Sequence, residues 1–283
     1  SSERGLGRVT ASASPSSPAH EGFSPQGFPG IHKDEPGSPP ITALGFSSGG
    51  LLFPYHWGVY KQLREMKLIT DRTIVAGSSG GSLVAAAHGS GIDSSHVDYA
   101  IETVFHDCRK GGTRFRLREV LEPVLREIMP EDIHEKVKHK AYIGVTMLQR
   151  PVPTCTLFNS FEDREDFIES LLASCYIPVY FDQGNLGMRY RGRWVCDGGI
   201  SNFVPSPPGE EKAIKVSCWP DTLGIWDIAL DTFRARSPYS TMQCLGLALT
   251  PGTLESQKYL EELGREDALR FVEARGLGGD GGT

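Results

Sequence analysis

The chain lacks a positive charge excess and any long apolar run, and each absence removes a class of function. Its 29 lysines and arginines are outnumbered by 35 aspartates and glutamates, which gives a formal net charge of -6. Nucleic-acid-binding modules usually carry a clear basic excess, so no nucleic-acid partner is expected. No apolar run approaches the ~20 residues that cross a bilayer. We therefore expect no transmembrane helix, and any contact with a membrane should be peripheral.

Paired cysteines are missing as well. The six cysteines are scattered along the chain, without Cys-x-x-Cys spacing and without the spacing of zinc ligands. Four of them lie in apolar stretches, where a free thiol behaves as a small hydrophobe. We expect reduced core cysteines, no disulfide framework and no metal site. The expected location is intracellular, in the cytoplasm or at a lipid surface.

Composition divides the chain into a tail, one large domain and a second short tail. Residues 1–40 are rich in Ser, Pro, Gly and Ala and show no apolar periodicity, which is typical of a disordered segment. The first segment could instead be the remnant of a plastid transit peptide, although Glu3 and Glu21 argue against this. Residues 41–275 are long enough for one catalytic domain with a sizeable core. Residues 276–283 form a flexible Gly-rich tail.

Apolar runs, Gly-rich turns and helical periodicity alternate from Ile41 onward. This alternation is typical of an α/β fold, in which helices cover a mostly parallel central sheet. Strands are predicted over 41–46, 73–76, 142–148, 154–158, 193–196 and 213–218. Helices are predicted over 51–66, 82–88, 94–108, 163–172 and 254–275, the last interrupted at Gly264.

The strongest local signal is Gly77-Ser78-Ser79-Gly80-Gly81, a G-x-S-x-G sequence between an apolar strand and a helix of small residues. In a nucleophile elbow the serine stands in a strained strand-to-helix turn, and Gly77 and Gly81 would let the backbone approach closely. A helix N-terminus also favours developing negative charge. We predict that Ser79 is a catalytic nucleophile. The alternative is an ordinary Gly-rich turn packed on the sheet.

A second Gly-rich turn, Ser47-Ser48-Gly49-Gly50, also follows a strand and opens a helix. Its amides should meet the same sheet edge as Ser79, so Gly49 and Gly50 are candidates for an oxyanion hole, which needs preorganised N–H donors. A phosphate loop is disfavoured because no Gly-x-x-x-x-Gly-Lys-Ser/Thr sequence occurs. The one G-x-G-x-x-G match begins at Gly276 and has no helix after it. No cofactor site is predicted.

Histidine is missing after residue 139, and this bears on the choice of the catalytic base. An α/β-hydrolase triad has the order Ser, Asp/Glu, His, and a histidine after Asp197 does not exist. Asp197 itself ends an apolar strand before Gly198-Gly199, so its carboxylate can face the serine, and partial desolvation would raise its pKa. From the residues alone, an Asx-turn role for Asp197 is the simpler interpretation. An upstream base, His56 or His106, would need a different topology.

Residues 109–118 contain five basic side chains, diluted by Glu119 and Glu122 just beyond. A solvated surface is the ordinary interpretation of such a stretch. The functional alternative is attraction to anionic lipid headgroups, at about 1 kcal/mol per basic residue near the surface.

Together these segments resemble the patatin-like phospholipase family, in particular its branch of animal-type acylglycerol lipases, from about residue 41 to residue 272. The family uses a Ser-Asp dyad, so the resemblance assigns the nucleophile to Ser79 and the base to Asp197, and it explains the missing histidine. Four segments match in the family's order: the Gly-rich turn with Tyr55-His56-Trp57-Gly58-Val59, the elbow, Ala173-Ser174-Cys175-Tyr176-Ile177-Pro178, and Asp197-Gly198-Gly199-Ile200-Ser201.

The resemblance implies a patatin-like fold of three layers, with helices on both faces of the sheet. It implies a serine acyl hydrolase without cofactor or metal, which cleaves fatty-acyl esters of glycerolipids such as triacylglycerol or phospholipid. Peripheral contact with a membrane or lipid-droplet surface is expected. A lipid transacylase on the same dyad and a catalytically silent lipid-binding regulatory protein are the alternatives.

The oxyanion turn departs from the family pattern G-G-G-x-[R/L]-G, because this chain reads Ser48-Gly49-Gly50-Leu51-Leu52-Phe53. Ser48 is expected to donate its amide as the glycine would. Phe53 puts a ring where close packing is expected, and it could instead line a groove for an acyl chain.

Overall fold

A computed structural model of the chain describes residues 39–149, 151–210 and 212–277. The tails predicted over 1–40 and 276–283 therefore lie almost wholly outside the described residues. Within those residues, eight strands form one sheet in the order β5-β6-β3-β2-β1-β7-β8, with β4 on the other edge of β3. The strands are β1 (Ala43–Phe46), β2 (Ile74–Ser78), β3 (Ala141–Met147), β4 (Thr154–Phe158), β5 (Met188–Tyr190), β6 (Arg193–Asp197), β7 (Ile214–Ser217) and β8 (Ile228–Ala229).

The central strands β3, β2, β1, β7 and β8 run parallel, whereas β4 and β6 are antiparallel to β3 and β5 is antiparallel to β6. This mostly parallel sheet confirms the α/β class. The helices are α1 (Phe53–Glu65), α2 (Gly80–Ser90), α3 (Ser94–Gly111), α4 (Leu117–Ile128), α5 (Ile133–Lys136), α6 (Arg164–Ser174), α7 (Thr241–Leu249) and α8 (Leu254–Arg275), with short 3-10 helices η1 (Gly50–Leu52) and η2 (Gly198–Ile200).

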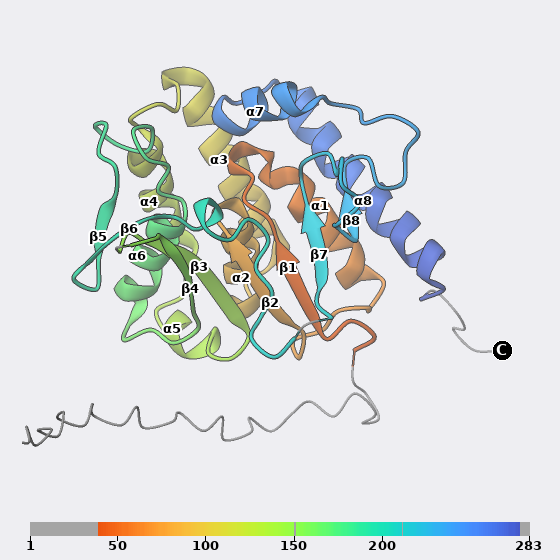
Figure 1. Ribbon diagram of the computed structural model, residues 1–283, viewed down its shortest axis with the longest axis horizontal. Helices are drawn as coiled ribbons and strands as arrows, with labels where there is room; N and C mark the ends of the chain where they lie inside the picture. The colour runs from red at the N-terminus through yellow and green to blue at the C-terminus, as the bar shows by residue number, and fades with distance from the viewer. Residues whose placement is uncertain (1–38, 150, 211, 278–283) are drawn as a thin grey trace, which may run out of the picture.

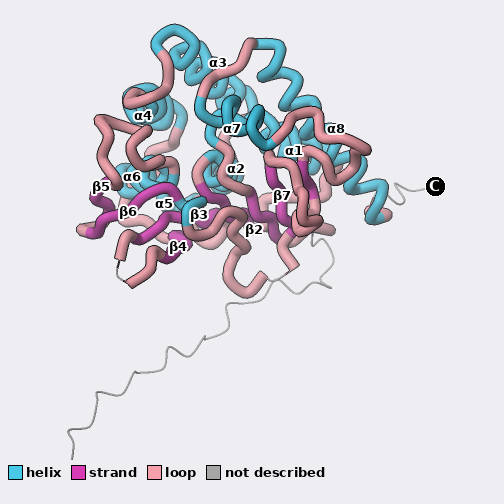
Figure 2. Tube along the Cα trace, turned by 45° about the horizontal axis from the view of Figure 1, so that its top comes forward, coloured by secondary structure: helices cyan, strands magenta, loops and turns pink. Residues whose placement is uncertain are grey.

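The two faces of the sheet are covered differently. The long helices gather behind the sheet in Figure 1 and above it in Figure 2. On the other face, the segment that follows β6 lies across the central strands. There the Ser78 hydroxyl donates to the Asn202 carbonyl at 2.9 Å, and a Cβ on Gly45 would come within 2.2 Å of the Pro205 carbonyl oxygen. The carboxyl ends of the parallel strands lie at one edge, where α/β sheets bind their ligands.

Helix α8 runs from Leu254 to Arg275 without a break, so the predicted interruption at Gly264 is wrong. The reason is a close crossing with α1. A Cβ on Gly264 would lie 2.1 Å from the Tyr55 carbonyl oxygen, and one on Gly58 would lie 2.0 Å from the Glu261 carbonyl oxygen. Glycine is present because two helix backbones touch, and the packing outweighs its low helix propensity.

Other predicted boundaries shift for local reasons. Helix α3 begins at Ser94 as expected, but its N-cap is Asp93, whose carboxylate accepts the Ser95 amide. Strand β2 extends to Ser78 and α2 begins at Gly80, so the predicted five-residue turn shrinks to Ser79 alone. Helix α4 was not predicted, and it contains Pro123.

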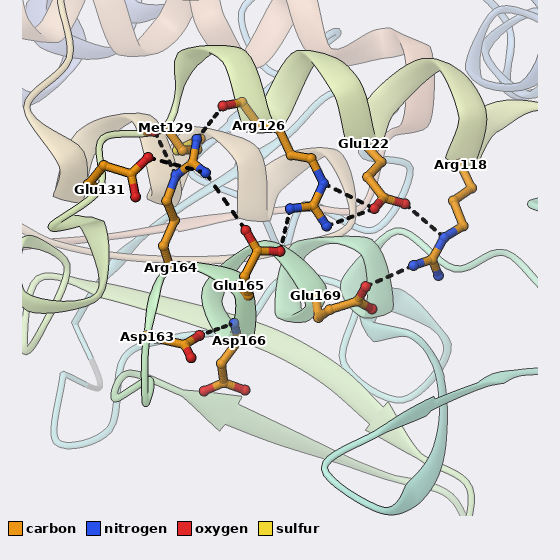
Figure 3. A network of polar contacts seen from close by, with 10 residues as sticks. All are labelled: Arg118, Glu122, Arg126, Met129, Glu131, Asp163, Arg164, Glu165, Asp166 and Glu169. Atoms are coloured by element: carbon orange, nitrogen blue, oxygen red, sulfur yellow. Dashed lines mark hydrogen bonds and ion pairs between the residues drawn. The ribbon is translucent and has the colours of Figure 1, made fainter.

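Figure 3 shows how α4 is fastened to α6 by ion pairs on its outer side. Arg118 contacts Glu122 at 3.0 Å and Glu169 at 2.8 Å, and Arg126 contacts Glu122 at 2.9 Å and also Glu165. The opposite side of α4 is apolar and faces the molecule's interior, with Val120, Leu121, Val124 and Leu125 buried.

The six cysteines are all free, and all except Cys155 are buried, as expected of thiols that pack in a core. Among the described helices, none combines the length and the apolar character that a membrane crossing requires.

Candidate active site

The register of the sheet brings the ends of β2 and β6 together. Strand β3 pairs with β4 along one edge, from residue 143 to residue 147. Its other edge is shared: β2 pairs with the first half, up to Ser78 opposite Gly144, and β6 pairs with the second half, ending with Asp197 opposite Val145. Because β2 and β6 run in opposite directions, they meet head to head. Ser79 and Asp197 stand at this meeting point.

Ser79 occupies the strained position of a nucleophile elbow. Its backbone has φ 54 and ψ -126, a conformation that side-chain-bearing residues adopt only when their surroundings hold them there. Its amide donates to the Ser174 hydroxyl at 2.9 Å, and Ser174 donates in turn to the Gly144 carbonyl at 2.7 Å. Its carbonyl accepts both the amide and the hydroxyl of Ser82, at 2.8 and 2.6 Å. These bonds fix the serine at the N-terminus of α2, with 3% of its surface exposed.

The glycines on either side of Ser79 are required by space. A Cβ on Gly77 would lie 2.0 Å from the Gly81 carbonyl oxygen, and one on Gly81 would lie 2.4 Å from the Phe46 carbonyl oxygen. Both contacts are with backbone, which cannot swing aside. The G-x-S-x-G spacing therefore allows α2 to start directly against β1 and β2.

Asp197 is buried, with 6% of its surface exposed. Its Oδ1 accepts the Gly199 amide at 2.8 Å and the Ser48 hydroxyl at 3.3 Å. Burial raises its pKa from 3.8 to about 6, against the opposing effects of the Ser79 hydroxyl, the Gly199 amide and the Ser48 hydroxyl. The predicted Asx-type turn is also present, since the same carboxylate caps η2. The turn and a role as base are therefore compatible.

The two glycines after Asp197 let its loop lie close to both neighbours. A Cβ on Gly198 would lie 2.1 Å from the Gly144 carbonyl oxygen, and one on Gly199 would lie 1.9 Å from Ser48 Oγ. The Ser79 hydroxyl is close enough to lower the Asp197 pKa, and its effect is larger than those of Gly199 and Ser48. Catalytic hydrogen bonds are often long until a substrate is bound.

The oxyanion turn differs from expectation at Ser48. Its amide donates to the Phe203 carbonyl at 2.9 Å, so it is not free for an oxyanion, and that expectation is wrong. The reason is a long-range contact with the segment that follows Asp197. Ser48 serves the site through its hydroxyl instead, which donates to Asp197.

The amides of Gly49 and Gly50 donate to no other group among the described residues. The carbonyls of the same two peptide units, those of Ser48 and Gly49, are held by hydrogen bonds. The Ser48 carbonyl accepts the Trp219 indole N–H at 2.7 Å and the Ser47 hydroxyl at 3.0 Å. The Gly49 carbonyl accepts the Leu52 amide at 2.9 Å. In a trans peptide the N–H points away from the C=O. The orientation of both donors is therefore set by what their carbonyls bind.

Gly80 is a further donor that the sequence-based prediction passed over. It is the first residue of α2, so its amide has no partner within the helix. A Cβ built on it would lie 3.1 Å from the Gly50 carbonyl oxygen and 3.4 Å from the Gly50 nitrogen. The amide after a nucleophile is a common oxyanion donor, and that general rule was the available signal.

The two histidines considered as alternative bases are placed elsewhere. His56 is fully buried, its Nε2 lies 3.1 Å from Ser47 Oγ, and burial lowers its pKa to about 3. His106 lies on the exposed side of α3 next to Asp107. Neither side chain contacts Ser79. Nor do the described residues include a cluster of His, Cys, Asp and Glu side chains that could hold a metal ion.

An apolar pocket opens at Ser79 and follows α2. Ser79, Gly80, Leu83 and Ala87 form one side, and α3 and α4 form the opposite wall, with Phe53 also at its lining. From Gly80 to Ala87 the helix rises about 10 Å. The space free of protein atoms amounts to about 850 Å³ with the open mouth and adjoining solvent included.

A strained serine elbow on a mostly parallel sheet, beside a buried carboxylate and an apolar pocket, is typical of serine hydrolases and acyltransferases. A family model described as patatin-like phospholipase matches residues 44–208. The chain therefore belongs to the patatin-like phospholipase family, and the resemblance drawn from its motifs is confirmed.

Several characterised proteins are similar to the chain. Human 1-acylglycerol-3-phosphate O-acyltransferase PNPLA3 is 26% identical over 257 residues, 83% of this chain and 51% of that protein. Human patatin-like phospholipase domain-containing protein 4 is 27% identical over 247 residues, 81% and 95% of the two chains. Mouse omega-hydroxyceramide transacylase is 23% identical over 221 residues, 76% and 33%. The chain thus spans about half the length of the first of these and a third of the last.

Among solved structures, VipD from Legionella pneumophila superposes with a TM-score of 0.52 at 12% identity, over 84% of this chain and 67% of that one. At this identity the likeness concerns the fold alone. It agrees with the patatin-like arrangement of sheet and helices.

Proposed function

We propose that the chain is a serine acyl hydrolase that cleaves fatty-acyl esters of glycerolipids through a dyad of Ser79 and Asp197. The observation that carries the proposal is the head-to-head meeting of β2 and β6 on one edge of β3. It sets a strained serine beside a buried carboxylate whose pKa is about 6. A carboxylate with a raised pKa is a better base than an exposed one and is still mostly ionised near neutral pH.

The reaction consists of two displacements, and in each of them Asp197 carries one proton: from Ser79 to the leaving alkoxide in the first, and from water to Ser79 in the second. Asp197 accepts the Ser79 proton as the serine oxygen attacks the ester carbonyl, and the amides of Gly49, Gly50 and Gly80 stabilise the oxyanion. The intermediate collapses, the C–O bond to the alcohol breaks, and Asp197 returns the proton to the leaving alkoxide. Water, activated by the same carboxylate, then attacks the acyl-enzyme and releases the fatty acid and free Ser79.

The pocket supports a fatty-acyl substrate. Its lining is almost entirely apolar side chains, and burial of each methylene of an acyl chain there stabilises the complex by about 0.8 kcal/mol. An acetyl ester would leave most of this space empty. Triacylglycerol and phospholipid present the same ester to the dyad, so both belong in a substrate panel.

Transacylation is the second candidate. The acyl-enzyme is common to hydrolysis and transfer, and two of the similar proteins are named an O-acyltransferase and a transacylase. Incubation of a labelled triacylglycerol with an added lysophospholipid distinguishes the two reactions. A hydrolase releases labelled fatty acid at an undiminished rate, whereas a transacylase yields labelled phospholipid.

The decisive experiment is labelling with a fluorophosphonate probe, which reacts with activated serines. Wild-type protein is expected to be labelled, and Ser79→Ala and Asp197→Asn are expected to lose labelling by at least about a hundredfold. Ser90→Ala is the matched control, because Ser90 is another buried serine of α2, whose hydroxyl donates to the Ala87 carbonyl and accepts the Ile92 amide, away from Ser79 and Asp197. A wild-type chain that resists the probe would indicate a silent lipid-binding protein.

A further inference from the structure

Helix α7 exposes an apolar side to solvent. Residues 237–254 contain no charged side chain, and α7 lies within them. Met242 and Leu245 are 73% and 43% exposed, and they stand on the same side of the helix as the half-buried Leu249. A complete capping box between Ser240 and Gln243 fixes the start of the helix. The exposed apolar side is therefore a feature of a well-formed helix.

Helix α7 packs against the turn at Gly50, and Gly50 lines the pocket. A Cβ on Gly50 would come within 2.4 Å of the Ala248 carbonyl oxygen, so α7 rests on the oxyanion turn. The Leu249 carbonyl accepts the Thr113 hydroxyl at 2.5 Å and also the Tyr180 hydroxyl. In Figure 1, α7 lies along the top of the molecule.

Cations flank α7 at the end of α3. Arg109 reaches the α7–α8 connection, where it donates to the Gly252 carbonyl and to Gln257 at 3.3 Å. Arg109, Lys110 and Arg114 are exposed, and none of them forms a salt bridge within the described residues. The other two members of the basic stretch, Arg116 and Arg118, pair with glutamates.

Acidic side chains lie near these cations: Asp107 on α3 and Glu255 at the start of α8. Glu255 lies close enough to Arg109 for the guanidinium to contribute to the lowering of the Glu255 pKa. A role in offsetting the helix dipole accounts for Arg109 and Lys110 at the C-terminus of α3. It does not account for Arg114, which lies beyond the helix.

We propose that Met242, Leu245 and Leu249 of α7, together with Arg109, Lys110 and Arg114, form a docking surface for a lipid surface that carries anionic headgroups. The apolar side chains would enter the boundary between headgroups and acyl chains, and the cations would lie at the headgroups. The purpose of this surface rests on the proposed function: an ester with a chain long enough for the pocket resides in a lipid phase, and the mouth must reach it there.

The test is co-sedimentation with vesicles, using the Ser79→Ala chain so that the lipids stay intact. One set of vesicles is phosphatidylcholine alone, and the other is an equimolar mixture of phosphatidylcholine and phosphatidylserine. The Ser79→Ala chain is expected to bind the mixed vesicles more tightly. Added to it, Lys110→Gln with Arg114→Gln should weaken binding to mixed vesicles about tenfold or more. Met242→Ser with Leu245→Ser should weaken binding to both sets about tenfold.

Matched controls remove the same groups elsewhere. Lys138→Gln with Lys140→Gln takes two exposed charges from the segment before β3, at the opposite edge of the sheet. Leu269→Ser removes an exposed leucine from α8, about four turns beyond its start. Neither is expected to change vesicle binding.

Three outcomes would overturn the proposal. These are no binding to either vesicle, binding by the α7 variant as tight as that of its parent, and a dimer in sedimentation that Met242→Ser with Leu245→Ser separates, which would make a second copy the occupant. The assay involves no ester cleavage. Failure of the dyad would appear in probe labelling and would leave the vesicle result unchanged.

Discussion

At the scale of single residues, Asp197 combines burial with the effect of three nearby donors, and their balance sets its pKa and so the pH range in which it could act as the proposed base. Burial raises its pKa to about 6, and the Ser79 hydroxyl, the Gly199 amide and the Ser48 hydroxyl hold it back from rising further. His56 is neutral throughout this range because burial lowers its pKa to about 3. The acid side of the pH profile should therefore report on Asp197 alone.

The first prediction concerns that profile. kcat/KM on a soluble ester is expected to fall about tenfold per pH unit below pH 6, as Asp197 takes up a proton and can no longer act as a base. Ser48→Ala removes a hydrogen bond to the carboxylate, so the Asp197 pKa should rise and the fall should begin at a higher pH. Ser90→Ala serves as control. A Ser48→Ala profile that is unmoved, or moved to lower pH, would contradict the assignment of the base.

The second prediction concerns Trp219, which touches no substrate but pins the Ser48 carbonyl and so orients the Gly49 amide. Trp219→Phe keeps an aromatic ring and deletes the N–H. We expect kcat to fall about tenfold with KM unchanged, a smaller loss than the roughly 10²–10³ seen when an oxyanion donor itself is removed.

Trp226→Phe is the control for this change. The Trp226 ring lies 6.3 Å from the same Phe203 ring that Trp219 approaches at 6.2 Å, but its indole N–H donates to none of the described groups. Equal effects of the two substitutions, or a rise in KM at constant kcat, would mean that Trp219 acts only by packing.

At the scale of helices and strands, the crossing of α1 and α8 depends on glycine. Gly264→Ala would place a methyl group 2.1 Å from the Tyr55 carbonyl oxygen, so the two helices must separate. We expect the free energy of unfolding to drop by about 2 kcal/mol or more. Gly246→Ala in α7 is the opposite case, because a Cβ there meets nothing within 4 Å, and it should stabilise by about 0.5–1 kcal/mol. Denaturant unfolding measures both, and a neutral Gly264→Ala would refute the crossing.

Local features of the site could be predicted from the sequence, whereas contacts between distant segments could not. The turn at Ser79 could be predicted because its requirements are local: a strand, a helix and two glycines. Asp197 could be placed at a strand end, but its meeting with Ser79 depends on β3 sharing one edge between two strands, which no local pattern reveals. The Ser48 amide was misassigned for the same reason, since Phe203 lies far along the chain. Gly264 suggested a break that tertiary packing overrides, and helix α4 with its Pro123 was not predicted.

At the scale of the whole molecule, the site is assembled where three separate parts of the chain meet. The sheet carries the proposed dyad, the turn after β1 and the start of α2 carry the proposed oxyanion donors, and α3 and α4 help to enclose the pocket. Of these parts, only the sheet carries the proposed catalytic pair, since Ser79 follows β2 and Asp197 ends β6. The pocket wall is attached to the rest mainly by packing inside and by ion pairs outside, as Figure 3 shows for α4 and α6.

Because of this attachment, the salt concentration is expected to affect the proposed hydrolase's preference between long-chain and short-chain esters. The pairs of Arg118 and Arg126 with Glu122, Glu165 and Glu169 are partly exposed, and ions screen such pairs within a Debye length of about 8 Å at physiological strength. We expect high salt to loosen α4 and to change the rate ratio between long-chain and short-chain soluble esters, with Arg126→Gln showing the altered ratio already at low salt. The ionic strength of the surroundings would then influence which fatty-acyl chain length is cleaved fastest.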